Sequence, residues 1–201
     1  MIAETIDLER ILNGLTFEES VKMSAKKLEE TDESKLDELQ KKRHGFRKLN
    51  IHRINRIEKT YTPSQEICEQ IMKITSPQIW MVLTEDWCGD SAQNIPYISK
   101  IAECNKNISL RLLPRDENLD LIDMYLTDGK SRSIPKLVSF DENGNELFQW
   151  GPRPEEAKKL VKDLKEQGFS KDEYEEKLHL WYAKNKGKNL DEEFIILLKS
   201  L

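Results

Sequence analysis

The sequence predicts an α/β fold in which a mixed sheet, built of parallel strands and a C-terminal antiparallel hairpin, is flanked by helices. Two apolar segments of strand length, 79–83 and 108–112, are separated by a helical pattern, so these strands should be parallel. Two further apolar segments, 136–140 and 146–150, flank the turn Asp141-Glu142-Asn143-Gly144. Asn-Gly between apolar strands is the strongest short-range hairpin pattern, so these two strands should be antiparallel.

The residues before the first strand are predicted to be helical. Thr16 and Glu19 match a capping box, and apolar residues then recur at helical spacing through 17–28. A polar break at 31–34 separates this helix from a longer one, whose apolar face runs through 36–61.

Helical patterns also precede, separate and follow the strands. The sequence Thr62-Pro63-Ser64-Gln65 begins a helix, with Thr as N-cap and Pro at the first helical position. Residues 63 to 167 have the predicted order α-β-α-β-α-β-β-α, and two more helices follow. We expect three parts: a helical extension at 1–62, an α/β domain at 63–168 and a second helical extension at 169–201.

Composition and charge argue against several classes of protein. Charged residues make up 34% of the chain, against about 25% in an average soluble domain, and hydrophobic residues 37%. The longest fully apolar runs, 79–83 and 194–198, are five residues each, whereas a membrane span needs about 20. No signal peptide is recognisable, and three cysteines are too few for a disulfide scaffold. We therefore expect a soluble cytoplasmic protein with no membrane partner.

Segment 41–60 departs from the acidic balance of the chain, whose net charge is −5. It holds eight Lys or Arg residues and one acidic residue, a net charge of +7 that leaves −12 for the rest. Such a face can dock an acidic partner or nucleic acid. No aromatic interleaving for base stacking is visible, so we favour a solvated helix face that pairs with the acidic stretch 18–38. Nucleic-acid binding is not expected.

One cysteine, Cys88, lies where the strand 79–83 ends and the next helix begins. Unpaired backbone N–H groups and the positive end of the helix dipole face a side chain at such a junction. Both favour a thiolate over a thiol, and the thiolate is the nucleophilic form of cysteine. Ser91, three residues on, can turn its hydroxyl toward the same sulfur. Cys88 and Ser91 are therefore the candidate catalytic residues.

The segment Trp87-Cys88-Gly89 at this junction resembles the Trp-Cys-Gly-x-Cys site of the thioredoxin superfamily. Pro96, eight residues past the cysteine, matches the position where thioredoxins kink this helix. Ile134-Pro135 opens the hairpin where the family carries a cis-proline, and the element order over 63–167 agrees with the family core. Within this superfamily the chain resembles bacterial thioredoxin-like proteins with a WCGDSAQ-type (CxxS) site and extra helices at both ends.

This resemblance implies a thioredoxin-like three-layer fold and a role for residues around the cysteine. Trp87 and Gly89 would border the bound substrate. The family implies that Pro135 is cis and faces the site, and that the backbone of the preceding residue, Ile134, pairs with substrate. The implied partner is a thiol or disulfide-containing protein, or a low-molecular-weight thiol.

The chain departs from the family pattern in ways that bear on function. Ser91 replaces the second cysteine, so a mixed disulfide would have to be resolved by an external thiol. Cys104 lies 16 residues from Cys88, about 24 Å along a helix, and Cys68 belongs to another helix. Both are expected to be buried structural cysteines. Val82 replaces the family's buried acid.

Three acidic residues beside the cysteine, Glu85, Asp86 and Asp90, should oppose the helix dipole by raising the pKa of Cys88. His44 and His52 lack a cysteine or acid at ligand spacing, so we expect no metal site and no cofactor.

Three hypotheses follow from this site. The first is a thiol–disulfide oxidoreductase that acts through Cys88 alone and forms a mixed disulfide. The second is a thioredoxin-fold binding or adaptor protein without turnover, because the resolving cysteine and the buried acid are both missing. The third is iron–sulfur cluster binding through one cysteine and glutathione; Trp87 and Asp90 do not match the Cys-Gly-Phe-Ser loop of monothiol glutaredoxins, which disfavours it.

Overall fold

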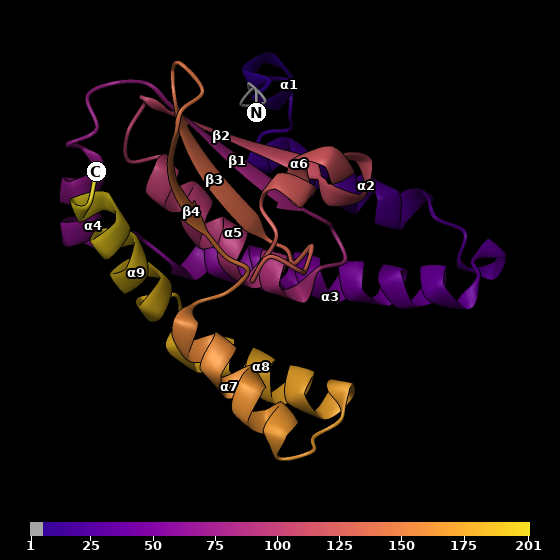
Figure 1. Cartoon of the computed structure of the whole chain (residues 1–201). Helices are drawn as coiled ribbons and strands as arrows, with labels where there is room; N and C mark the ends of the chain where they lie inside the picture. The colour runs from indigo at the N-terminus through magenta and orange to yellow at the C-terminus, as the bar shows by residue number, and fades with distance from the viewer. Residues whose placement is uncertain (1–5) are drawn as a thin grey trace.

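The computed structural model describes residues 6–201, whose path is shown in Figure 1. Within these residues the strands form a four-stranded sheet in the order β2-β1-β3-β4. Strand β1 (Gln78–Thr84) pairs in parallel with β2 (Ile108–Pro114) and antiparallel with β3 (Lys136–Asp141). Strand β3 pairs antiparallel with β4 (Glu146–Trp150). The predicted α/β fold with a mixed sheet and a C-terminal hairpin is confirmed.

Helices surround this sheet in the order that the sequence predicts. Helix α5 (Gly89–Ala102) connects the two parallel strands, and its first residue follows Cys88 directly. Residues 1–5 of the predicted N-terminal extension lie outside the described residues. The remaining helices are α1 (Leu8–Leu12), α2 (Phe17–Glu30), α3 (Glu38–Thr60), α4 (Gln65–Ile71), α6 (Leu119–Met124), α7 (Glu155–Glu166), α8 (Lys171–Asn185) and α9 (Lys188–Lys199), with 3₁₀ turns η1 (Glu33–Lys35) and η2 (Arg115–Glu117).

Local sequence explains where several of these elements begin. The capping box at the start of α2 forms as predicted, with Thr16 and Glu19 each satisfying a backbone N–H of the other. Helix α4 begins two residues later than expected, because the Ser64 hydroxyl, and not that of Thr62, accepts the N–H of Ile67. In the β3–β4 turn, Gly144 has a φ of +83°, a conformation that glycine adopts without strain.

Alternate residues of β1 face two hydrophobic layers. Trp80 and Val82 pack in a core with α4, α5 and α9, to which Ile57 of α3 contributes. Ile79 and Leu83 face the opposite core, which α1 and α6 supply. All of β1 is buried, as its continuous apolar run predicts for a strand covered on both faces. The sheet is therefore the middle of three layers.

Helices α7 and α8 form a hairpin with a small core of its own, made by Ala157, Val161, Leu178 and Tyr182. Figure 1 shows this pair past the end of the sheet at which β4 leads into α7, whereas α9 returns to lie beside α4. No helix in the described part of the chain is long and apolar enough to span a membrane. The division of the chain at residues 62 and 168 stays a prediction.

Candidate functional site

Cys88 is the N-cap residue of α5, at the point where the chain leaves β1. The backbone N–H of Ser91 donates to the Cys88 Sγ atom at 3.5 Å, and the Cys88 thiol donates to the carbonyl oxygen of Ile134 at 3.4 Å. The Ile134–Pro135 peptide bond is cis. The structure thus brings Cys88, Ser91, Ile134 and Pro135 together, although Ile134 lies 46 residues beyond Cys88 in the chain.

The Ser91 side chain is oriented by a buried hydrogen bond. Thr84 Oγ1 donates to Ser91 Oγ at 2.8 Å, so the Ser91 hydroxyl proton is free to point elsewhere. A side-chain hydrogen bond from Ser91 to Cys88 lowers the pKa of the thiol. Ser91 therefore stabilises the thiolate with both its backbone N–H and its hydroxyl.

Two other effects outweigh this stabilisation. Burial raises the pKa of the Cys88 thiol, and the Asp90 carboxylate raises it further, to about 11. The sulfur is therefore a thiol at neutral pH in the resting chain. Of the three acidic residues expected to act in this way, Asp90 has the effect, whereas Asp86 is paired with Arg47 and Glu85 accepts a hydrogen bond from the backbone N–H of Asp116.

Asp90 connects the start of α5 to the α7–α8 hairpin. One carboxylate oxygen accepts a hydrogen bond from Arg153, and the other accepts one from the Tyr182 hydroxyl at 2.7 Å. Asn94 also donates to the Tyr182 hydroxyl, at 3.0 Å. Burial raises the pKa of Asp90, and Arg153 and Tyr182 oppose this shift. Sequence analysis assigned no role to Arg153 or Tyr182, because their pairing with Asp90 spans 63 and 92 residues.

The basic segment 41–60 is in part the solvated face that we expected, since Lys41 and His44 pair with Glu38 and Glu33 of the stretch 18–38. The same segment also contributes to the site, which the sequence did not predict. Arg47 is only 5% exposed and donates two hydrogen bonds to Asp86, at 2.7 and 2.9 Å. Asn50 donates to the backbone carbonyls of Asp86 and Cys88. Helix α3 packs along α5, so its polar face meets the cysteine loop and not water alone.

Two cationic side chains contact the Trp87 ring. The Arg43 guanidinium is 4.6 Å from the ring centroid, and that of Arg115 is 5.4 Å. Gly89, the first residue of α5, lies against His179 of α8, because a Cβ atom at Gly89 would be 2.8 Å from the His179 ring. The two neighbours of Cys88 in the chain are therefore both covered by side chains from other helices. Arg43 of α3 covers Trp87, and His179 of α8 covers Gly89.

A cavity of about 250 Å³ opens beside Cys88, between α3 and α8. Its charged lining includes Arg53, Arg153 and Lys171 against Asp90 and Glu175. His179 also lines it. Burial and the nearby arginines lower the pKa of His179 to about 4, so this ring is neutral at pH 7.

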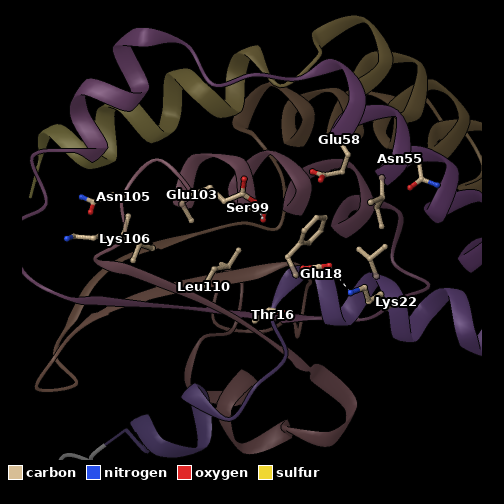
Figure 2. Close-up of a pocket in the computed structure, with 15 residues that line it drawn as sticks. Thr16, Glu18, Lys22, Asn55, Glu58, Ser99, Glu103, Asn105, Lys106 and Leu110 are labelled. Atoms are coloured by element: carbon tan, nitrogen blue, oxygen red, sulfur yellow. Dashed lines mark hydrogen bonds and ion pairs between the residues drawn. The ribbon is translucent and has the colours of Figure 1, made fainter.

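A second cavity, of about 710 Å³, lies away from this site. Figure 2 shows Glu18 and Lys22 of α2 on one side of it and Glu58 of α3 and Ser99 of α5 on the other. A narrow crevice of about 40 Å³ shares Phe17 with it and reaches Cys88. That volume has room for only a few water molecules, which is too little for a thiol or disulfide substrate.

No group of three or more His, Cys, Asp or Glu residues within 6–201 is arranged to hold a metal ion. The thiol is held instead by a strand end, a helix start and a cis-proline loop. This fold and this site define a thioredoxin-fold protein with one cysteine at the start of its helix.

A family model described as thioredoxin matches residues 36–165, more than half of the chain, and the chain belongs to this family. The matched residues include α3, which we had expected to lie in an N-terminal extension. None of the curated proteins compared with the chain matches it.

Solved structures resemble the whole chain. The crystal structure of an HIV epitope-scaffold protein is 16% identical, with a TM-score of 0.59, and the match covers 98% of this chain and 99% of that one. A protein of unknown function from Pseudomonas aeruginosa is 17% identical, with a TM-score of 0.53, and the match covers 92% of this chain and 98% of that one. At these identities the likeness shows the fold alone.

Proposed function

We propose that this protein is a monothiol thiol–disulfide oxidoreductase in which Cys88 is the attacking residue. The observation that carries the proposal is the group of contacts made by the Cys88 sulfur. Cys88 Sγ lies at the start of α5, accepts the Ser91 N–H at 3.5 Å, and is 3.4 Å from the Ile134 carbonyl beside the cis Pro135. The positive end of a helix dipole and nearby hydrogen-bond donors are the features that stabilise a thiolate.

One cycle needs two exchanges. The Cys88 thiolate attacks the low-molecular-weight sulfur of a mixed disulfide on a substrate protein; the new S–S bond forms as the substrate thiol leaves and takes up a proton. A second low-molecular-weight thiol then attacks that sulfur. Cys88 leaves and is reprotonated, and a low-molecular-weight disulfide is released. The external thiol replaces the resolving cysteine, whose position is occupied by Ser91.

The cavity beside Cys88 supports an anionic external thiol. Arg53, Arg153 and Lys171 line it; Arg153 pairs with Asp90 and Lys171 with Glu175, which leaves the Arg53 guanidinium to pair with a carboxylated thiol of the glutathione type. Backbone groups at Ile134 and the rings of Trp87 and Pro135 then supply the protein-substrate side, as the family resemblance implies. Free cysteines suit a reducing compartment, so we propose a cytoplasmic location.

The test is the rate of deglutathionylation of a model peptide, with reduced glutathione as the external thiol. Cys88→Ser should abolish catalysis. Ser91→Ala removes one hydrogen bond to the thiolate, which raises the pKa of Cys88 by about one to two units and slows exchange about 3- to 10-fold. Exchange that survives Cys88→Ser contradicts the proposal.

The second candidate is an adaptor that binds partners without turnover. Its specific support is the raised pKa of Cys88, about 11, which leaves few thiolates at neutral pH. An adaptor should retain a defined partner with equal affinity after Cys88→Ser, and the wild-type protein should show no exchange above the Cys88→Ser background. Loss of partner binding on this substitution contradicts the adaptor function.

A further inference from the structure

The other two cysteines of the chain contact each other. Cys68 lies in α4 and Cys104 lies two residues past the last residue of α5, and their Sγ atoms are 2.7 Å apart. Both are partly exposed free thiols, which differs from the expectation of buried structural cysteines. The sequence predicts two separate helices for them and leaves open whether they meet, because 36 residues separate them in the chain. Helix α5 carries Cys104 back to α4.

The backbone around the pair is held in place independently of the thiols. Asn105, next to Cys104, donates hydrogen bonds to the carbonyl oxygens of Ile71 and Ile74 at the end of α4, at 2.8 and 2.9 Å. Helices α4 and α5 also pack on the same core. The packing of α4 against α5 thus places the two sulfurs next to each other. A disulfide can therefore form without moving these two helices apart.

This pair is separate from the Cys88 site. Cys88 caps the first turn of α5 and Cys104 follows its last turn, and a 14-residue helix is about 21 Å long. Cys104 therefore does not resolve a disulfide formed on Cys88 in the folded chain.

We propose that Cys68 and Cys104 are a second redox site, which a low-molecular-weight disulfide converts reversibly into an intramolecular disulfide. One thiolate of the pair attacks the small disulfide, forming a mixed disulfide and releasing one small thiol. The other cysteine then attacks the protein sulfur of that mixed disulfide, and the second small thiol leaves. The pair loses two electrons and two protons, and the small disulfide becomes two thiols.

Burial and the adjacent Cys68 thiol raise the pKa of Cys104 to about 12. Glu103 adds to this shift, and the Tyr61 ring also lies close to both cysteines. Oxidation should therefore be slow at neutral pH, whereas the disulfide, once formed, connects α4 to the end of α5 and restricts the unfolded chain.

Peptide mapping tests the proposal directly. Trypsin cleaves after Lys59, Lys73, Lys100 and Lys106, so Cys68, Cys88 and Cys104 fall in separate peptides, 60–73, 74–100 and 101–106. The full chain is incubated with glutathione disulfide at pH 8, denatured, alkylated and digested. The expected product is peptide 60–73 linked to peptide 101–106, and dithiothreitol should separate the two.

The Cys88→Ser variant makes this test independent of the proposed function. It should still form the link, and its melting temperature should rise by about 5–10 °C on oxidation, the usual size for a disulfide that closes a loop of this length. The matched Cys68→Ser/Cys88→Ser variant should show neither change. Peptides 60–73 and 101–106 recovered unlinked from wild type and Cys88→Ser, or a link that leaves the melting temperature unchanged, would overturn the proposal.

Discussion

Asp90 controls the reactivity of Cys88, and Asp90→Asn measures that control. The substitution keeps the shape of the side chain and removes its negative charge. Two unit charges about 5 Å apart interact by about 3 kcal/mol at an effective dielectric constant of about 20. Arg153 already offsets part of this interaction by pairing with Asp90. We therefore expect the pKa of Cys88 to fall by about one to two units from its value of about 11.

The rate change follows from two opposing effects. A fall of one to two units raises the thiolate fraction at pH 7.5 about 10- to 100-fold, but each thiolate becomes less nucleophilic as its pKa falls. With a Brønsted coefficient of about 0.45, alkylation of Cys88 by iodoacetamide should become about 3- to 12-fold faster. The assay is the rate of label incorporation into peptide 74–100 by mass spectrometry.

Asp86→Asn is the matched control for this experiment. Asp86 lies in the same loop and is also paired with an arginine, Arg47, but it is not among the main causes of the pKa shift of Cys88. Both variants lose the partner of a largely buried arginine, so both should melt at a lower temperature. Only Asp90→Asn should accelerate alkylation. An unchanged rate in Asp90→Asn, or the same acceleration in both variants, refutes this account of the electrostatics.

Two further predictions concern stability. Burial raises the pKa of Asp191 to about 6, above its unfolded value near 4, so the native state binds more protons between these values and stability falls as pH rises from about 4 to 6. The free energy of unfolding of Asp191→Asn should therefore exceed that of wild type by about 1–2 kcal/mol at pH 7.5, after a discount for partial exposure, and should equal it at pH 4. Urea titrations at both pH values check this. Gly151 has a φ of +121°, and a Cβ atom there would lie 2.2 Å from the Pro135 carbonyl oxygen. Gly151→Ala should lower stability by at least about 3 kcal/mol, measured by the same titration, whereas Gly168→Ala, at a φ of +84° with open space around it, should cost about 1–2 kcal/mol.

Elements with a strong local pattern could be predicted from the sequence. The apolar run of β1, the Asn-Gly turn of the hairpin and the capping box of α2 each depend on neighbouring residues, and each forms as expected. The position of Cys88 at a strand–helix junction follows from the same local patterns.

The surroundings of Cys88 could not be predicted, because they depend on contacts between distant segments. Arg47 pairs with Asp86 across 39 residues, and Tyr182 pairs with Asp90 across 92. A helical charge pattern shows that Arg47 is on a polar face, but it does not show what that face meets. The contact between Cys68 and Cys104 was missed for the same reason, since helix directions decide it.

The pH dependence of a single exchange tests the central claim most directly. The Cys68→Ser/Cys104→Ser variant, in which Cys88 is the remaining thiol, reacts once with glutathione disulfide, and the rate of mixed-disulfide formation is followed between pH 7 and 9.5. Because the pKa of Cys88 is about 11, the rate should rise about tenfold per pH unit without levelling, and the further substitution Cys88→Ser should eliminate the product. A rate that levels below pH 8.5 contradicts the burial of the thiol, and a chain that forms no mixed disulfide at Cys88 contradicts the monothiol function itself.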